Sequence, residues 1–481
     1  MQLTIILRTL GILLVLFSAS LLLPVLISAF YDDGELFHFA ATLWVSLVAG
    51  LALWLPFRRC QRSLRNRDGF VIVGMFWLVM SLVTAVPFAV GLGMSPAWAV
   101  FEAVSAFTTT GATVIVGLDQ LPRSILFYRQ QLQWLGGIGV VVTAVALLPM
   151  MGVGGMQLVR AEISGPMKEE KLTPRINHTA KALWKVYGVL TLACALAYWL
   201  AGMDLFDAVA HSFSTVSTAG FSTHDASLGH FNSPVIEAIA MVFMLAGAIN
   251  FALHFTAWQH LTVRGYLRNA EVRVFLGVVA VLILITTAVL VTEGRYPEPL
   301  HALRYAAFQV VSVVTTSGFN TDDFSLWPSM LPVLLIFSSF MAGCAGSTSG
   351  GMKTIRYIVL FKQGLLEISS LIHPNLVRPL KIDNRVVPPR VIQAVWGFFA
   401  AYIASFALIM LALMMLGLDQ VTAFGAVAAS INNLGLGLGQ VSANFTAMPD
   451  AGLWILSFAM LLGRLEIFTL LVLLTPGFWR R

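Results

Sequence analysis

Residues 343–354, GCAGSTSGGMKT, carry the glycines, the lysine and the hydroxyl group of a phosphate-binding loop in almost the right order. The motif G-x-x-x-x-G-K-[ST] surrounds phosphates with backbone N–H groups, and its lysine neutralises their charge. Here Met352 separates Gly351 from Lys353, and the preceding MLPVLLIFSSF is a long apolar helix pattern rather than the short strand that such a loop follows. The segment therefore does not predict a nucleotide site on this chain.

Paired carboxylates would indicate a second kind of chemistry, an enzyme acting on a lipid phosphate through a metal or through acid–base catalysis. Asp322 and Asp323 are the best such pair, but nothing like a DDxxD motif follows them. The three cysteines, at positions 60, 194 and 344, are scattered and have no metal-ligand spacing. An enzyme remains only a remote alternative.

Four glycines, about one hundred residues apart, each follow a run of small hydroxyl, amide or apolar residues: TTTGATV at 108–114, STAGFST at 217–223, TTSGFNT at 315–321 and NNLGLGLG at 432–439. Glycine admits unusual φ values and lets backbones approach closely. Four such turns around one axis can point carbonyl oxygens inward and replace the water around a monovalent cation. The expected ion-contacting residues are Thr109, Thr110, Gly111, Thr218, Ala219, Gly220, Thr316, Ser317, Gly318, Asn433, Leu434 and Gly435.

A short apolar segment precedes each glycine run and is too short to cross a membrane. We interpret the four segments as re-entrant half-helices, whose negative C-terminal ends would also favour a cation. They begin near residues 97, 205, 299 and 419.

The elements that must position these turns are membrane spans. Of the 481 residues, 58% are hydrophobic and only 11% are charged, and mean hydropathy is +0.84, whereas soluble domains carry about 25% charged residues. Apolar stretches of about 20 residues, enough to cross the hydrocarbon core, recur from end to end. The ten expected spans are 4–29, 37–57, 70–91, 128–152, 180–201, 234–258, 271–292, 329–361, 391–416 and 451–475.

The positive charges separate by side of the membrane, with most of the 29 Lys and Arg in alternate connections. The positive-inside rule then predicts a multi-pass protein with both termini in the cytoplasm. Because the basic residues do not gather into one patch, the charge of +6 does not indicate nucleic acid as a partner.

The repeat predicts an all-α integral membrane fold. Each of four pseudo-symmetric units would contain a span, a re-entrant half-helix with its glycine turn, and a second span, arranged around a central pore and preceded by two extra transmembrane helices. The expected divisions are 1–68 for the N-terminal pair, 69–155 for repeat 1, 156–260 for repeat 2, 261–389 for repeat 3 and 390–481 for repeat 4.

At this level of detail the sequence resembles the Trk/Ktr/HKT superfamily of potassium transporters, most closely the bacterial Trk system membrane subunit. The resemblance covers essentially the whole chain. It rests on the four glycine runs and on GCAGSTSGGMKT at 343–354, HPNLVRPLKI at 373–382 and GRLEIFTLLVL at 463–473. In this superfamily four such units form a potassium-channel-like pore in one chain.

The resemblance implies potassium uptake across the bacterial inner membrane, with potassium as the transported ion. A serine in place of the first filter glycine accompanies sodium permeation in the family, and Gly111 is a glycine here. The fourth turn differs from the other three, because it carries Asn432, Asn433 and Leu434 where they carry Thr, Ser or Ala. We therefore expect an asymmetric filter that is less strict than that of a fourfold potassium channel.

The glycine-rich segment 343–351 lies in the inner half of a span, just beneath the expected filter. Non-helical backbone at that depth is tolerated where it lines protein or a water-filled cavity, and the resemblance implies an intramembrane loop that blocks the ion path and moves to open it. Close helix packing through small residues is the alternative. The expected gating residues are Gly343, Gly346, Ser347, Thr348, Ser349, Gly350, Gly351, Lys353 and Arg464.

Several charged and titratable side chains fall within or beside the spans. Arg464 lies deep in a span and is expected to face the pore or a separate ion-pair partner, because Glu466 points to another face of the same helix. Lys353 is expected to anchor at the interface, with a possible share in gating, and Glu102 to cap or fix its half-helix. The histidines have no ligand spacing and predict satisfied polar or interfacial groups: His211, His224, His254 and His301.

Membrane potential would drive uptake, at about 2.3 kcal/mol per 100 mV for one charge. The resemblance further implies a homodimer and a cytosolic regulatory subunit that carries the nucleotide. The basic segments 156–185 and 363–390 offer docking surface for that subunit, or serve topology alone. A sodium-selective or ion-coupled (H⁺ or Na⁺) transporter of the same fold remains the alternative function.

Overall fold

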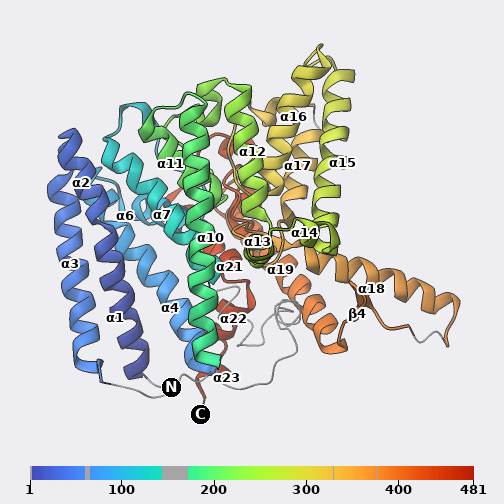
Figure 1. Ribbon diagram of the computed structural model, residues 1–481, viewed down its shortest axis with the longest axis horizontal. Coiled ribbons are helices and arrows are strands. Elements are labelled where there is room, and N and C mark those ends of the chain that lie inside the picture. The colour runs from blue at the N-terminus through green and yellow to red at the C-terminus, as the bar shows by residue number, and fades with distance from the viewer. Residues whose placement is uncertain (1–2, 60–65, 143–171, 329, 376–377, 481) are drawn as a thin grey trace.

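The computed structural model describes residues 3–59, 66–142, 172–328, 330–375 and 378–480. Within these ranges the chain is a bundle of helices, and both chain ends are marked at the same end of it (Figure 1). Long outer helices expose large apolar side chains such as Leu192, Leu284 and Leu408. Such broad apolar exposure fits a lipid environment rather than water. The multi-pass membrane fold expected from composition is therefore confirmed.

An N-terminal group of helices packs at one side of the bundle (Figure 1). Its backbones touch because Gly11 and Gly50 face each other: a Cβ on Gly11 would lie 2.7 Å from the carbonyl oxygen of Gly50. Small residues commonly allow such close approach in membranes. These elements are α1 (Leu3–Ser20), α2 (Leu22–Tyr31) and α3 (Leu36–Trp54).

The remaining helices repeat one pattern four times: an outer helix, a short buried helix, a glycine turn and a second inner helix. The outer helices are α4 (Asn66–Thr84) with α5 (Val86–Gly91), α10 (Leu172–Leu200), α15 (Ala270–Thr292) and α19 (Pro389–Met415). The short helices are α6 (Pro96–Phe107), α11 (Leu205–Val216), α16 (Pro299–Val314) and α20 (Gln420–Ile431). The inner helices are α7 (Arg123–Val142), α12 (Pro234–Ala248) with α13 (Phe251–His260), α17 (Met330–Phe340) with α18 (Thr354–Ile372), and α21 (Asp450–Arg464) with α22 (Phe468–Leu474).

The short helices begin where the sequence supplies a capping side chain. Ser95, Asp204 and Asp419 each accept a hydrogen bond from a backbone N–H in the first turn of α6, α11 and α20. Such caps satisfy donors that a helix start leaves free. Each short helix ends one residue before its hydroxyl- or amide-rich turn, so its C-terminus points at the turn.

Two spans that the sequence predicts as continuous are broken. The predicted span 234–258 bends by 99° between α12 and α13, and 451–475 bends by 116° between α21 and α22. Each of these two predicted spans therefore contains two helices joined at a bend. By length and composition, six described helices can cross a membrane, or eight if each bent pair counts as one span. Part of the predicted 128–152 lies outside the described residues.

The first break has a clear cause. Ala248 and Gly247 offer their carbonyl groups to Cys344 and Thr348 rather than to the next helical turn, at 2.8 and 3.1 Å, and Phe251 N–H donates to the Gly346 carbonyl at 3.1 Å. The glycine-rich loop therefore replaces the helical hydrogen bonds that the bend removes, as irregular backbone at membrane depth requires.

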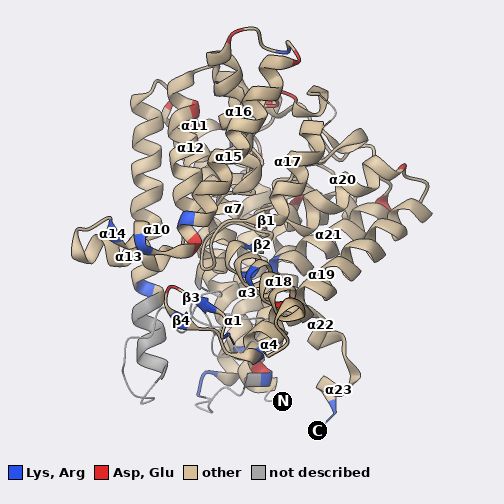
Figure 2. Cartoon of the chain, turned by 90° about the vertical axis from the view of Figure 1, so that its right-hand side faces the viewer, with Lys and Arg blue, Asp and Glu red and all other residues tan. Residues whose placement is uncertain are grey.

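Smaller elements complete the described fold, and charged residues divide between its two ends. Most Lys and Arg lie in the half that holds both chain ends, whereas Asp and Glu are frequent at the opposite end (Figure 2). The elements are α14 (Arg264–Arg268), α23 (Pro476–Trp479), the parallel pair β1 (Met341–Ala342) and β2 (Met352–Lys353), and the antiparallel hairpin β3 (Lys381–Ile382) and β4 (Arg385–Val386).

Candidate ion-conduction site

The four glycine turns have the same backbone conformation. In each, the residue two before the glycine has a positive φ, and so does the glycine itself. Side chains disfavour positive φ in single non-glycine residues, so its recurrence at equivalent positions marks a repeated design. The values are 55° and 81° for Thr109 and Gly111, 51° and 79° for Thr218 and Gly220, 55° and 79° for Thr316 and Gly318, and 51° and 82° for Asn433 and Gly435.

The turns meet in a closed ring. The space where each glycine would carry a Cβ is occupied by the carbonyl oxygen of the residue before the next turn's glycine, so only glycine fits. Gly111 contacts Ala219, Gly220 contacts Ser317, Gly318 contacts Leu434, and Gly435 contacts Thr110, which returns to the first turn. All four predicted ion-contacting triplets therefore lie together around one axis.

Side chains behind the first turn fix it in place. Arg129 and Glu102, both fully buried, form an ion pair of 2.9 Å. Glu102 also accepts hydrogen bonds from the Thr113 hydroxyl and from Val114 N–H, and Arg129 donates to the Ser222 carbonyl beyond the second turn at 3.3 Å. Glu102 thus fixes the extended segment that follows the first glycine turn rather than capping the helix. Sequence reasoning missed this role of Arg129, because the role depends on Glu102, which lies 27 positions away.

The fourth turn differs from the others in its side-chain bonds. In the first and third turns, paired hydroxyls lie 2.8 Å apart, Thr108 with Thr110 and Thr315 with Ser317. In the fourth, the Asn433 amide donates to the Thr110 hydroxyl at 2.9 Å and to the Met460 carbonyl at 3.0 Å. Asn433 therefore ties the fourth turn to the first.

The loop 343–351 lies against the inner side of three turns. The loop contains four of the predicted gating residues, Gly343, Gly346, Ser347 and Ser349, and both of these serines are buried. Thr348 donates to the Val216 carbonyl at 3.1 Å and accepts from Thr218 at 3.1 Å, Gly350 N–H donates to the Thr316 hydroxyl at 2.7 Å, and Gly351 N–H donates to the Asn432 carbonyl at 2.9 Å. The loop is thus in hydrogen-bond contact with turns two, three and four.

A single carboxylate holds both ends of this loop. Glu271 Oε1, in the first turn of α15, accepts hydrogen bonds from Ala345 N–H at 2.8 Å and from Ile355 N–H at 3.0 Å. Sequence reasoning missed Glu271, because an acidic residue at the start of a helix is ordinarily explained by the helix dipole.

Two cations contact the loop from below. Arg464 Nη1 donates to the Thr348 carbonyl at 2.9 Å, and Lys353 Nζ donates to the carbonyls of Ser349 and Gly350. Lys353 is 6% exposed, so its prediction as an interfacial anchor is wrong. Glu466 pairs with Arg356 of α18, which confirms that Arg464 has a separate partner, although that partner is a carbonyl and not a carboxylate.

A titratable cluster joins the loops that follow turns one and two. His224 Nδ1 lies 2.5 Å from Asp119 and its Nε2 lies 3.0 Å from Asp207. Burial lowers the pKa of His224, but hydrogen bonds to the two carboxylates outweigh it and raise that pKa above 6.5; the bond from His224 lowers the pKa of Asp119. Asp119, His224 and His230 could also hold a metal ion, a grouping that sequence spacing missed because it joins two distant loops.

The other histidines are as the sequence predicts. His211 is buried and bonds to the Asp207 carbonyl and the Ser222 hydroxyl, and His254 bonds to Tyr266 and the Ala246 carbonyl. His301 is exposed beside Glu298.

A closed ring of four glycine turns above an intramembrane loop is the arrangement expected of a cation pathway, and comparison with known proteins decides the family. The family model TrkH, described as a cation transport protein, matches residues 35–479. The chain belongs to the TrkH family. This TrkH-family membership confirms the resemblance and the prediction of a transport protein rather than an enzyme.

Individual TrkH relatives are similar over their whole length. The chain is 52% identical to the Trk system potassium uptake protein TrkH of Halomonas elongata, covering 100% of both chains, and 51% identical to the protein of that name from Escherichia coli (strain K12), covering 98% of both. The crystal structure of the potassium transporter TrkH from Vibrio parahaemolyticus matches with a TM-score of 0.93 and 49% identity, covering 100% of both chains.

Proposed function

We propose that this chain takes up potassium across the bacterial inner membrane, driven by the membrane potential. The observation that carries the proposal is the closed ring of glycine turns, in which each glycine contacts the next turn's carbonyl oxygen. Backbone carbonyls in such a ring can replace the hydration shell of a potassium ion. The names of the relatives, potassium uptake proteins, support the same ion.

The twelve residues of the four triplets, from Thr109 to Gly435, form the filter in this proposal. The loop 343–351 is the gate, because its hydrogen bonds to turns two, three and four put it directly below the ring. Arg464 and Lys353 hold the gate by donating to its carbonyls and add positive charge on the ion path. Together these features give a filter on the outer side and a barrier on the inner side.

The topology proposed has both termini in the cytoplasm, since both ends lie at the end of the bundle that carries most Lys and Arg (Figure 2). The chain then divides into an N-terminal pair, 1–68, and four repeats, 69–155, 156–260, 261–389 and 390–481. A homodimer and a cytosolic nucleotide-binding regulatory subunit complete the assembly. Much of the basic segment 156–185 lies outside the described residues, whereas 363–390 includes the far half of α18 and the β3–β4 hairpin.

Ion flux into vesicles containing the purified full chain tests the proposal. Uptake of ⁸⁶Rb⁺ is expected to exceed that of ²²Na⁺ at an imposed inside-negative potential, without a pH gradient. Gly220→Ala should reduce this preference by about tenfold or more, because its Cβ would displace the Ser317 carbonyl. Gly188→Ala is the matched control, since nothing lies within 4 Å of its Cβ.

The same measurement separates the alternatives. Equal or greater sodium flux would support a sodium-selective transporter, a strict requirement for a proton or sodium gradient would support coupled transport, and the absence of flux for every ion would overturn the proposal.

A further inference from the structure

Glu271 connects the loop 343–351 to the cytoplasmic side of the bundle. Glu271 is 2% exposed, and its carboxylate accepts hydrogen bonds from Ala345 N–H within the loop and from Ile355 N–H in the first turn of α18, the helix that follows the loop. Any force that moves the first turn of α15 therefore acts on both ends of the loop at once.

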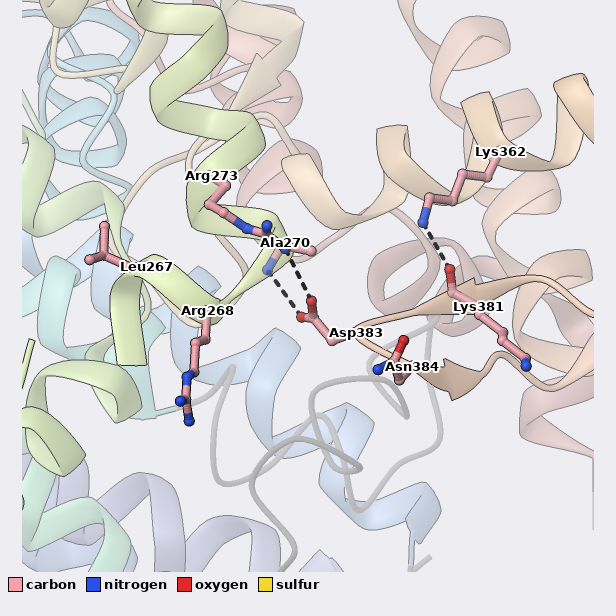
Figure 3. A pocket seen from close by; sticks show the side chains of 8 residues that line it. All are labelled: Leu267, Arg268, Ala270, Arg273, Lys362, Lys381, Asp383 and Asn384. Carbon is pink, nitrogen blue, oxygen red and sulfur yellow. Dashed lines mark hydrogen bonds and ion pairs between the residues drawn. The ribbon is translucent and has the colours of Figure 1, made fainter. Parts of the chain in front are cut away.

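An open cavity of about 650 Å³ lies beside that turn. Its floor is the β3–β4 hairpin, which links α15 to α18: Asp383 accepts a hydrogen bond from Ala270 N–H at 3.0 Å and pairs with Arg273 at 3.7 Å, and Lys362 donates to the Lys381 carbonyl at 2.8 Å (Figure 3). The two helices joined by the hairpin are the ones that hold the loop, since α15 carries Glu271 and α18 follows the loop directly.

The cavity is strongly positive. Arg268, Arg273, Lys362 and Lys381 line it, and Asp383 is the only acidic side chain among the described residues of the lining. Asp383 is already engaged by Ala270 and Arg273, so within the described lining the cations outnumber the anions.

Exposed apolar side chains occur on the elements that border the cavity, and Leu267 is itself one of the lining residues. Leu261 is 89% exposed and Leu267 is 70% exposed on the α13–α14 side, and Phe361 is 70% exposed on the α18 side. Cations beside exposed apolar side chains, at the cytoplasmic end of membrane helices, are typical of surfaces that bind anionic lipid headgroups with the acyl chains alongside.

We propose that this cavity binds the phosphate headgroup of an anionic phospholipid and that the bound lipid stabilises the loop 343–351 in the position described. The second half of this statement rests on the proposed function, in which that loop is the gate. The phosphate would lie among Arg268, Arg273 and Lys362, which come from α14, α15 and α18. A ligand that bridges these elements favours the arrangement in which they are close.

A binding measurement tests the site without any transport. The full chain is reconstituted with a phosphatidylglycerol and phosphatidylcholine mixture, and the lipids that remain bound after detergent extraction are counted by native mass spectrometry. Arg268→Gln combined with Lys362→Gln should retain phosphatidylglycerol about fivefold less than the parent chain. Arg264→Gln is the matched control, because it lies on the same short helix and does not line the cavity.

Equal retention of phosphatidylglycerol by the double variant and the parent chain would overturn the proposal. It would favour an acidic protein surface as the ligand of the cavity. Inorganic phosphate, added to protein in phosphatidylcholine alone, distinguishes a lipid headgroup from free phosphate as the source of the bound phosphate group. If inorganic phosphate at low concentration binds saturably at Arg268 and Lys362, and the chain does not prefer phosphatidylglycerol over phosphatidylcholine, the ligand is a soluble phosphate. That result would overturn the lipid assignment.

Flux tests the link to the gate. Rubidium uptake in phosphatidylglycerol vesicles is expected to be about fivefold lower than in phosphatidylcholine vesicles, and the double variant should lose this difference. Specific lipid binding with equal flux in both vesicles would overturn the link between the cavity and the loop. A failure of the proposed function is distinct, because it would abolish rubidium uptake in both lipids while leaving lipid retention intact.

Discussion

Arg464 and Thr348 lie 116 positions apart in the chain, yet the guanidinium donates a 2.9 Å hydrogen bond to the Thr348 carbonyl. The hydroxyl of the same threonine donates to the Val216 carbonyl at the end of α11. A cation on the last inner helix is therefore connected through one residue to the base of the second glycine turn. The Nε and Nη2 atoms of Arg464 have no hydrogen-bond partner among the described residues, as expected for a buried cation that faces a hydrated cavity.

Replacing Arg464 by alanine should raise rubidium flux. The change removes a positive charge from the proposed ion path. It also removes a charged hydrogen bond to the loop, worth about 1.5–3 kcal/mol, so the increase should be about tenfold. Rubidium uptake into vesicles measures it. Arg378→Ala, an exposed arginine, is the control. Unchanged flux at normal expression and stability would show that Arg464 is structural only.

Replacing Gly350 by alanine should also raise flux, without changing charge. The added Cβ would collide with the Asn432 carbonyl and push the loop away from the fourth turn. Backbone at this position cannot yield easily, so we expect several-fold faster uptake rather than simple accommodation. Gly364→Ala on α18 has open space around its Cβ and should behave like the parent chain. Lower flux in Gly350→Ala would contradict the gating role.

Replacing Arg129 by methionine should destabilise the protein, because it leaves Glu102 buried without its counter-charge. Loss of one partner of a buried pair costs about 3–5 kcal/mol. The midpoint of thermal unfolding in detergent should fall markedly, while the exposed Arg264→Met stays close to the parent. Adding Glu102→Gln to Arg129→Met should recover part of the loss. No recovery in the double variant would indicate that the two side chains act independently.

His224 makes the outer contact between turns one and two dependent on pH. Its pKa is raised in the folded chain, so its contribution to stability is complete below its ordinary value of 6.5 and is lost as pH rises through the raised value. The pKa of Asp119 is lowered, so its contribution is present above 3.8 and is lost as pH falls through the lowered value. The contact is therefore strongest between 3.8 and 6.5.

Thermal unfolding of the parent and of His224→Gln measures this dependence. The difference in midpoint should be largest between pH 3.8 and 6.5 and should shrink as pH rises above 6.5 and His224 loses its proton. Asp207, His211 and His230 also surround His224, so His230→Gln serves as a control for the stacked neighbour. An equal difference at both pH values would exclude an effect of His224 protonation.

Patterns that recur along the chain predicted most of the fold. The glycines at 111, 220, 318 and 435 were recognisable because each requires a backbone conformation or a close approach that only glycine accommodates, and these requirements repeat at similar intervals. The break at 343–351 was predictable because its composition conflicts with a helix at membrane depth.

Features that depend on a single tertiary contact were not predictable. The bend before Asn250 exists because Gly346 and Cys344 bind the freed backbone groups, and nothing in the apolar sequence 234–258 indicates it. Likewise, Lys353 follows a glycine run near basic residues, a pattern that predicts a position at the membrane interface. In the structure its ammonium group points inward and donates to the Gly350 carbonyl of the loop. Glu271 and Arg129 gain their roles from partners 27 to 84 positions away.

The ring of turns is assembled within one continuous polypeptide, so its four quadrants are encoded separately. In a tetramer of identical subunits one codon change alters every quadrant together, and a carbonyl cage rarely survives such a change. Here the fourth quadrant carries Asn433 where the other three carry threonine at the equivalent position, and it still completes the ring. A substitution in this chain therefore alters one quadrant of the ring and leaves the sequence of the other three unchanged.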